Sequence, residues 1–465
     1  MRRDTDAHHD EILRQASLEH VRLLVEKNRQ DTGLDGPPVA PRRIGSIGIV
    51  GAGMMGTAIA AVHLKHDLPV RISDTDETML AGAGDKIVSE LSGETSEAKT
   101  RGLVDRLVSP VADETDLAGC DLVLESIVED VYLKRQLYGR LQPRLSGQTI
   151  LASNTSTIPI ERLADGLADP ERFCGFHFCH PVQQRPLVEI IRGPATSDLT
   201  ITTMVAHAKA VGKMPIVVAD GPGFLINRLL LPYLGEALEL LLEGVDIKDV
   251  EAAATGFGMA KGPLGLLDEI GLDTTLKGGL VLAAAFPERT VASPLLVAMV
   301  KAGLLGVKSG AGFFTYDRKT DDIQAERTLN AAATRLIAQW AYSPQKQMPE
   351  KPTPEKPSPE KPSPGEITTR LFLPMVLEAT RILAEQRVRH PRDIDLGVLF
   401  GLGFPAQRGG LLWWADTLGA AEIIEMLRSL ERLGPRAEPT PLLIEMARDD
   451  TRFYDPPAHR GVGLA

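Results

Sequence analysis

The sequence predicts an α/β protein with a doubly wound, mostly parallel sheet followed by two related all-α domains. Two observations lead to this prediction. Between Ile44 and Ala219, short β-rich runs alternate with helical runs, as in a sheet built from strand–helix–strand units. After Gly223 the pattern turns helical to about residue 340, and a further helical segment begins at Glu366.

The first strand of this region leads into a glycine-rich turn. The apolar run Ile44–Val50 predicts a buried strand, and Gly51-Ala-Gly53-Met-Met-Gly56 follows it at the start of a helix. Gly51 permits a tight turn, Gly53 lets the backbone approach a pyrophosphate, and Gly56 lets the helix pack closely on the strand. N–H groups at the helix start would hold the phosphates. The predicted cofactor-binding residues of this turn are Gly51, Gly53, Met54, Met55 and Gly56.

An acidic residue completes the dinucleotide motif. A second strand, Pro69–Ser73, ends in Asp74, whose carboxylate can bind both hydroxyls of an adenosine ribose. A glycine pattern alone, in a chain with 43 glycines, is compatible with a simple turn. The succession of strand, glycines, helix, strand and acid instead favours a dinucleotide site. Because Asp74 would repel a 2′-phosphate, we expect the cofactor to be NAD rather than NADP.

Composition limits the possible classes of protein. A chain of 465 residues is long enough for roughly three domains. No apolar run is long enough to span a membrane, and the charged N-terminus lacks the apolar centre of a signal peptide. The net charge of −11 argues against a nucleic-acid partner. Three cysteines do not make a disulfide framework, and we expect a cytoplasmic protein.

We expect five consecutive segments, and the two helical domains among them resemble each other. Arg228–Pro232 (Arg-Leu-Leu-Leu-Pro) matches Arg370–Pro374 (Arg-Leu-Phe-Leu-Pro), and Glu236 matches Glu378, which favours duplication of one helical domain. The proline-rich repeats between them predict an extended polyproline spacer. The expected segments are an N-terminal helical arm (1–43), an NAD-binding domain (44–220), a first helical domain (221–342), a proline-rich linker (343–365) and a second helical domain (366–465).

Two polar segments outside the glycine motif predict a catalytic site. Residues 153–156, Ser-Asn-Thr-Ser, follow a strand at the sheet edge where such sheets bind ligands. If Phe173–Phe178 and Leu187–Ile191 pair as neighbouring strands, His177 and Glu189 can come into contact. A carboxylate that binds one ring nitrogen leaves the other as a base. By itself, a strand histidine beside a strand glutamate is more often structural.

The same segment contains two cysteines and two histidines, which raises the alternative of a metal site. Strand alternation would place Cys179 on the face of His177, whereas Cys174 and His180 would point to the opposite face. Zinc ligands usually come as spaced pairs around a turn. We therefore expect no metal.

Together these motifs resemble the 3-hydroxyacyl-CoA dehydrogenase family, and in particular the dehydrogenase half of the multifunctional fatty-acid oxidation α-subunit. The resemblance covers about residues 44–320 and 366–455 and implies a Rossmann-type fold. The enoyl-CoA hydratase domain of the multifunctional relatives has no counterpart here, so we expect no hydratase activity. The motifs that carry the resemblance are Gly51–Gly56, Val123–Glu129, Leu151–Ile160, His177 with Pro181 and Glu189, Gly221–Arg228, Gly306–Phe313, Gly401–Pro405 and Gly409-Gly410.

The resemblance implies roles for individual residues. Oxidation of a secondary alcohol needs a base for the hydroxyl proton and donors for the developing oxyanion. The implied catalytic residues are His177 as general base, Glu189 as its orienting partner, and Ser156 and Asn227 as the groups that hold the substrate oxygen. The residues implied to lie near the cofactor are Glu129 and Lys134.

One position departs from the family's pattern of histidine, two aromatic residues, asparagine and proline. Here the segment reads His177-Phe-Cys179-His180-Pro181. Cys179 in place of an aromatic residue indicates a change of packing. His180 replaces an amide that cannot titrate with a ring that can, and we expect this substitution to alter the pH dependence of the reaction.

The sequence therefore predicts NAD-dependent oxidation of L-3-hydroxyacyl-CoA to 3-ketoacyl-CoA in fatty-acid β-oxidation. Two alternatives remain open: a short-chain 3-hydroxybutyryl-CoA dehydrogenase working in reduction, and a catalytically weakened scaffold subunit of a β-oxidation complex. The expected partners are the acyl-CoA substrate and a thiolase or hydratase. In single-copy family members the helical domain mediates dimerisation, so two copies predict a monomer with an internal pseudo-dimer, or a weak oligomer.

Overall fold

The structure is a computed structural model that describes residues 2–37, 39–92, 96–111, 113–290, 292–316, 327–342 and 362–454. Its residues form two compact units. The sheet unit consists of residues 19–225 and 386–401, and the helical unit contains the described residues up to 18, from 226 to 385 and from 402 onward. Most of the linker expected at 343–365 lies outside the described residues.

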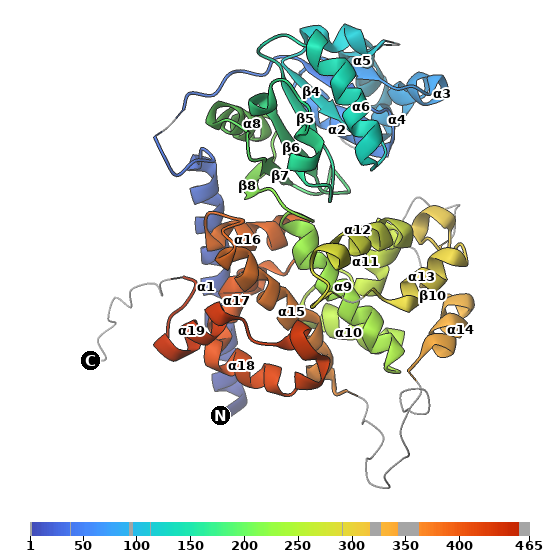
Figure 1. Ribbon diagram of the computed structural model, residues 1–465. Coiled ribbons are helices and arrows are strands. Elements are labelled where there is room, and N and C mark those ends of the chain that lie inside the picture. Colours follow the sequence, from blue (N-terminus) through green and yellow to red (C-terminus); the bar gives the residue numbers. More distant parts are fainter. Residues whose placement is uncertain are drawn as a thin grey trace. The chain divides into compact units, whose positions relative to one another are not determined.

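The sheet unit contains an eight-stranded sheet with the order β3-β2-β1-β4-β5-β6-β7-β8. Figure 1 labels β4 to β8 of this sheet. Neighbouring strands are parallel except β6 and β7, which are antiparallel. The strands are β1 (Ile47–Val50), β2 (Val70–Ser73), β3 (Val108–Pro110), β4 (Leu122–Glu125), β5 (Ile150–Ser153), β6 (Phe173–Phe178), β7 (Leu187–Arg192) and β8 (Met214–Ala219). The predicted doubly wound, mostly parallel sheet is confirmed, although the short edge strand β3 was not anticipated.

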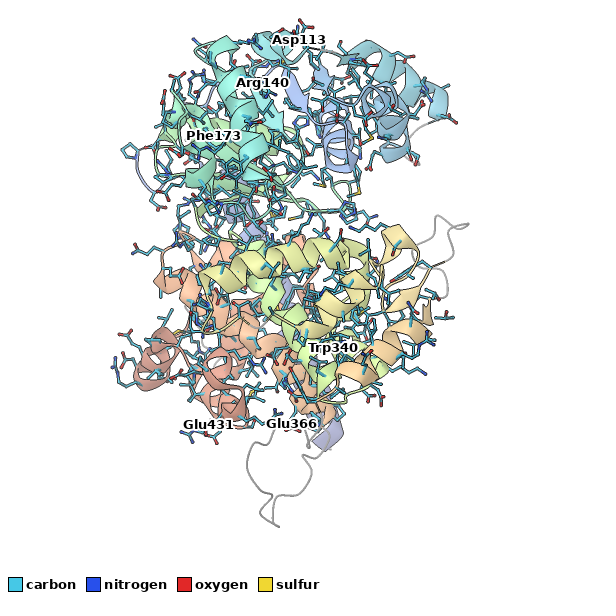
Figure 2. All side chains as sticks on the ribbon, turned by 45° about the vertical axis from the view of Figure 1, so that its right-hand side comes forward. Asp113, Arg140, Phe173, Trp340, Glu366 and Glu431 are labelled. Carbon is cyan, nitrogen blue, oxygen red and sulfur yellow. The ribbon has the colours of Figure 1, made fainter. Side chains whose placement is uncertain are left out.

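Helices cover the sheet and bury its apolar strands. Ile47, Ile49, Leu122 and Leu124 are fully buried in this core. Phe173, which is labelled in Figure 2, is the first residue of β6. Its ring lies 5.2 Å from that of Tyr138. The helices are α2 (Met54–Leu64), α3 (Glu77–Ala81), α4 (Ala83–Glu90), α5 (Glu97–Leu107), α6 (Val131–Leu141), α7 (Ile160–Ala164), α8 (Asp198–Ala210) and α16 (Pro391–Gly397), with part of α1 (Arg2–Gln30).

The edge strand β8 is covered by two segments that lie far from it in sequence. Val388 forms an antiparallel bridge with Val218, and Arg387 O accepts a hydrogen bond from Ala219 N at 2.8 Å. From the N-terminal arm, Asn28 Nδ2 donates to Pro215 O at 2.8 Å. These contacts satisfy backbone groups that an open sheet edge would leave exposed.

The helical unit contains two copies of a helical motif that pack on each other through α9 and α15. Figure 1 shows these two helices side by side, and Phe257 of the first copy stacks on Phe372 of the second at 3.8 Å. The elements are α9 (Ile226–Leu242), α10 (Ile247–Phe257), α11 (Pro263–Ile270), α12 (Leu272–Ala285), α13 (Pro294–Lys301), β9 (Phe314–Thr315), β10 (Thr328–Leu329), α14 (Ala331–Trp340), α15 (Pro364–Ala384), α17 (Leu411–Leu418), α18 (Ala420–Arg428) and α19 (Pro441–Asp449).

The boundaries of the two compact units differ from those of the five consecutive segments expected from the sequence. Residues 19–43 of the expected arm and residues 386–401 of the expected second helical domain both belong to the sheet unit. The five segments therefore remain a prediction about domain organisation. No helix within the described part of the chain is long and apolar enough to cross a membrane.

Candidate active site

The glycine turn between β1 and α2 has the geometry that the motif predicts. Gly51 has a φ of +109°, and an added Cβ would lie 2.5 Å from Ser126 O. A Cβ on Gly56 would lie 1.8 Å from Gly51 O. Both positions therefore need glycine for the turn and for the close packing of the helix on the strand. An added Cβ on Gly53, by contrast, would meet no described atom within 4 Å.

The open space at Gly53 fits a dinucleotide. Gly53 is the N-cap residue of α2, and among the described residues no side chain caps this helix end. Met54 is 61% exposed, and the first turn contains no acidic residue. N–H groups at such a helix start bind phosphate, and a glycine without a Cβ lets the backbone approach it. Gly51, Gly53, Met54, Met55 and Gly56 thus suit the pyrophosphate of NAD.

Asp74 directly follows β2 and is fixed beside the glycine turn. One carboxylate oxygen accepts a hydrogen bond from Ala52 N at 2.7 Å, and the other accepts one from Asp76 N at 2.9 Å. The side chain of Asp76 caps α3 through Thr78 N and Met79 N. Two carboxylates at the end of β2 oppose the binding of a 2′-phosphate, which favours NAD over NADP.

A buried polar network lies under the ends of β4 and β5. Glu125, the last residue of β4, is fully buried and contacts Lys134 Nζ at 2.6 Å and Ser153 Oγ at 2.7 Å. Tyr138 also donates its hydroxyl to Glu125, and burial together with this carboxylate raises the pKa of Tyr138 well above its usual value. The network fixes the two strand ends relative to each other.

Glu129 extends this network to the loop that contains Ser156. It contacts Lys134 at 3.2 Å and accepts hydrogen bonds from Thr155 Oγ1 at 2.6 Å and Ser156 N at 3.0 Å. Burial tends to raise the pKa of Glu129, but Lys134 and these donors outweigh it and lower the pKa below its usual value. Lys134 itself is only 1% exposed. These contacts show Lys134 and Glu129 holding the loop after β5, and their predicted proximity to the cofactor stays a prediction.

His177 and Glu189 lie opposite each other on the antiparallel strands β6 and β7. His177 Nδ1 is 2.7 Å from Glu189 Oε2, and the other carboxylate oxygen accepts a hydrogen bond from Leu225 N at 3.0 Å. Glu189 is fully buried and His177 is 8% exposed. A carboxylate at Nδ1 makes that nitrogen the proton donor of the neutral ring and leaves Nε2 as the basic nitrogen. The predicted contact is therefore present.

The remaining predicted residues lie in different places. Ser156 is partly exposed after β5, and Asn227 is partly buried at the start of α9, in the helical unit. His180, just beyond β6, is exposed, whereas Cys179 is buried, and burial raises the pKa of its thiol. No individual role was predicted for Glu125, Tyr138 or Ser153, although Ser153 opens the predicted polar segment 153–156. A glutamate that ends an apolar strand was the one available signal for this network.

Comparisons with known proteins agree with this geometry. Residues 46–221 match the NAD-binding domain of 3-hydroxyacyl-CoA dehydrogenase, and residues 223–316 match the C-terminal domain of the same family. The solved 3-hydroxybutyryl-CoA dehydrogenase of Escherichia coli is 25% identical with a TM-score of 0.72, over 88% of this chain and 99% of that one. The (S)-3-hydroxybutyryl-CoA dehydrogenase of Ralstonia eutropha is 34% identical with a TM-score of 0.56, over 59% of this chain and 100% of that one.

A third solved structure matches nearly the whole chain in fold. The dehydrogenase part of multifunctional enzyme 1 from C. elegans is 24% identical with a TM-score of 0.63, over 92% of this chain and 96% of that one. The whole Ralstonia structure aligns with 59% of this chain. The Escherichia coli and C. elegans structures align with 88% and 92% of it. The added length in this chain is consistent with a second helical copy.

Proposed function

Because the chain belongs to the 3-hydroxyacyl-CoA dehydrogenase family and is an NAD-dependent enzyme of that type, we propose that His177 is its general base. The contact between His177 Nδ1 and Glu189 is the observation that carries this proposal. It leaves Nε2 to accept the proton of the substrate's 3-hydroxyl group. NAD, when bound, supplies the acceptor for the hydride that leaves the same carbon. The buried charge of Glu189 then stabilises the imidazolium that forms.

The substrate oxygen needs hydrogen-bond donors while the hydroxyl becomes a carbonyl. We propose that Ser156 and Asn227 supply them, as the resemblance implies. Ser156 suits this role because Glu129 holds its backbone N–H at the carboxyl end of the sheet, where parallel sheets bind ligands. Asn227 brings an amide donor from the first turn of α9. We further propose that Glu129 and Lys134 support the cofactor through the position of this loop.

For the physiological reaction, we propose the oxidation of L-3-hydroxyacyl-CoA in fatty-acid β-oxidation, in the cytoplasm and with a thiolase or hydratase as partner enzyme. A second candidate is a short-chain 3-hydroxybutyryl-CoA dehydrogenase working in reduction. The names of the similar Escherichia coli and Ralstonia enzymes favour this second candidate. The His177–Glu189 pair argues against a weakened scaffold subunit, because a scaffold has no need of an oriented base.

Substitution of the pair tests the proposed mechanism. His177→Ala is expected to lower turnover by roughly 10²–10⁴-fold while NADH binding persists, because proton transfer alone is lost. Glu189→Gln is expected to be impaired as well, since an amide does not stabilise an imidazolium as a carboxylate does. Absorbance of NADH measures turnover, and NADH fluorescence measures binding. His180→Asn, at an exposed position three residues further along, is expected to keep or raise turnover and to change only its pH dependence. The proposal is wrong if both pair variants turn over within about threefold of the parent.

Acyl chain length separates the two candidate substrates. The same absorbance assay with acetoacetyl-CoA and with longer 3-ketoacyl-CoAs compares kcat/KM across chain lengths. The β-oxidation proposal expects substantial turnover of the longer substrates, and the short-chain candidate expects a steep decline beyond four carbons. An absence of turnover at every length and pH would instead support the scaffold alternative.

A further inference from the structure

The segment 386–401 of the sheet unit contains Arg387, which contacts the backbone after β8. We propose that Arg387 is a positioning residue for the His177–Glu189 pair and acts through the turn 219–225, which begins at the last residue of β8. The proposal rests on the proposed function, because it assumes that Glu189 orients the general base. Its effect on the pair passes through hydrogen bonds with the backbone of the turn.

Arg387 contacts the first half of this turn at successive residues. Its backbone oxygen accepts a hydrogen bond from Ala219 N at 2.8 Å, and its guanidinium Nη1 donates to Asp220 O. A Cβ added to Gly221 would lie 3.3 Å from Nη1, so the guanidinium lies directly against that glycine. Guanidinium hydrogen bonds to a carbonyl oxygen are charge-assisted and hold geometry well.

The second half of the turn holds Glu189. Leu225 N donates to Glu189 Oε1 at 3.0 Å, while Oε2 of the same carboxylate contacts His177. Phe224 N donates back to Gly221 O at 3.2 Å, and the Phe224 ring lies 6.3 Å from the His177 ring. A displacement of Gly221 would therefore be passed on to Phe224 and Leu225.

The turn also has a backbone conformation that needs external support. Gly223 has a φ of +71° and Phe224 a φ of +49°, so two successive residues adopt left-handed conformations. A bulky residue such as Phe224 rarely adopts this conformation unless its surroundings hold it there. Asp220 anchors the turn from one side, because its carboxylate accepts the N–H groups of Ile160 and Glu161 at 2.8 and 2.7 Å. Arg387 anchors it from the segment 386–401.

The same segment offers a matched control. Arg389 lies two residues after Arg387, and its guanidinium contacts Asp31 at 2.7 Å. Arg392 contacts the same carboxylate. Arg389→Ala thus removes the same charge from the same segment without removing a contact to the turn, and Arg392 remains to bind Asp31.

The test is steady-state kinetics of the full-length variants. Arg387→Ala is expected to lower kcat by about 10-fold to 100-fold, since small misplacements of catalytic groups have effects of that size. KM for NADH is expected to stay within about twofold, because the glycine turn is untouched. Arg387→Lys should recover part of the loss, since a lysine still donates to Asp220 O. Arg389→Ala should keep kcat within about twofold of the parent.

A double-mutant cycle with Glu189→Gln locates the effect. If Arg387 acts through Glu189, Arg387→Ala is expected to lower kcat by less than about threefold in the Glu189→Gln background. The inference is overturned if Arg387→Ala keeps parental kcat, if Arg389→Ala is equally impaired, or if the Arg387→Ala loss is undiminished in that background. Should Glu189→Gln itself turn over like the parent, the proposed function fails and this inference with it. An impaired Glu189→Gln with a normal Arg387→Ala refutes this inference alone.

Discussion

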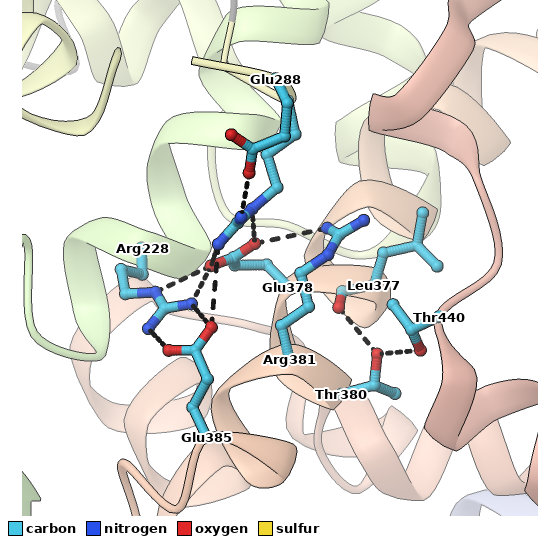
Figure 3. A network of polar contacts seen from close by, with 9 residues as sticks. Arg228, Glu288, Leu377, Glu378, Thr380, Arg381, Glu385 and Thr440 are labelled. Atoms are coloured by element: carbon cyan, nitrogen blue, oxygen red, sulfur yellow. Dashed lines mark hydrogen bonds and ion pairs between the residues drawn. The ribbon is translucent and has the colours of Figure 1, made fainter. Parts of the chain in front are cut away.

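The helices α9 and α15 are two copies of one element, and each copy binds the other with the same residues. Arg228 on α9 pairs with Glu378 and, at 2.7 Å, with Glu385 (Figure 3). Arg370 on α15 pairs with Glu236 at 2.8 Å and with Glu243 at 2.5 Å. Glu236 and Glu243 on α9 are the counterparts of Glu378 and Glu385 on α15. Each arginine therefore pairs with the same two positions of the opposite helix. This reciprocity is the property of a two-fold symmetric interface, formed here within a single chain.

The two copies diverge in the helix that follows. In the first copy, α10 stays in the helical unit, and its Phe257 stacks on Phe372 of α15. The corresponding part of the second copy, residues 386–401 with α16, belongs to the sheet unit and covers the edge strand β8. The second copy therefore has two structural roles. It completes the helical interface, and it supports the unit that contains His177 and Glu189.

Truncation after Pro364 tests both roles at once and has the largest expected effect. Removal of the second copy deprives Arg228, which is 2% exposed, of Glu378 and Glu385, and it uncovers the apolar surface of α9. It also removes residues 386–401 from the sheet unit. We expect the truncated chain to aggregate or to dimerise through the uncovered surface, and to lose turnover. Size-exclusion chromatography with light scattering, together with the NADH assay, measures both properties.

The outcomes of this truncation distinguish the two roles. A truncated protein that dimerises and retains full turnover would show that the segment 386–401 is dispensable for catalysis. A truncated protein that stays monomeric with undiminished turnover would contradict the internal interface as well. The full-length chain under the same conditions is the control, and we expect it to behave as a monomer.

Substitution of single glutamates compares the two halves of the interface. Glu378 binds three arginines, Arg228, Arg289 and Arg381, whereas Glu236 binds Arg370 and Arg436. A buried charge that loses its partner destabilises a protein by about 3–5 kcal/mol. We expect Glu378→Gln and Glu236→Gln to lower the free energy of unfolding by about that amount, with the larger effect at Glu378. Urea denaturation monitored by tryptophan fluorescence measures the difference.

An exposed ion pair in the same unit gives the control for these glutamates. Arg428 contacts Glu425 at 2.6 Å, and both side chains are more than 60% exposed. Glu425→Gln is expected to change the free energy of unfolding by less than about 0.5 kcal/mol. If Glu378→Gln has no larger effect than this control, the reciprocal pairs do not stabilise the interface.

Much of the fold and part of the site were predictable because they depend on local patterns. The assumption that Phe173–Phe178 and Leu187–Ile191 are neighbouring strands was enough to predict the contact between His177 and Glu189. The recurrence of Arg-Leu-x-Leu-Pro indicated the duplication. Other contacts join separate segments of the chain, and no local sequence pattern predicts which residues will meet. The placement of Val388 on β8 and the binding of Tyr138 to Glu125 arise only when separate segments pack.

In each copy an aspartate binds two successive backbone N–H groups, and the sequence did not predict this contact either. Asp268 accepts the N–H groups of Phe313 and Phe314, each at 2.9 Å. Asp416 in the second copy does the same with Phe453 and Tyr454, each at 3.0 Å. The spacing between the aspartate and its aromatic residues differs between the copies, so the sequences do not align in register. In the structure, Asp268 lies on α11 and Asp416 on α17, and each accepts two successive backbone N–H groups.

A buried position that differs between the copies gives the smallest expected effect, and it depends on pH. Glu239 on α9 corresponds to Arg381 on α15 and lies beside Glu236, Glu243 and Arg436, with its carboxylate accepting the hydroxyl of Tyr342 at 2.8 Å. Burial raises the pKa of Glu239 above its usual value. The folded protein therefore binds the proton of the Glu239 carboxyl more tightly than the unfolded chain does. This difference stabilises the folded protein below about pH 4.5, and the stabilisation is lost as the pH rises through the raised pKa.

Glu239→Gln replaces the carboxylate with a neutral group of similar shape and removes this titration. We expect the variant to gain stability relative to the parent at pH 8 and to gain little at pH 5, measured as urea midpoints at the two pH values. Arg381→Gln is the matched comparison at the equivalent position. Burial also lowers the pKa of Arg381 from its usual value, but an arginine stays charged at both pH values, so its substitution should shift both midpoints by the same amount. Equal shifts for Glu239→Gln at both pH values would show that this carboxylate does not titrate between them, and that the two copies differ here in packing alone.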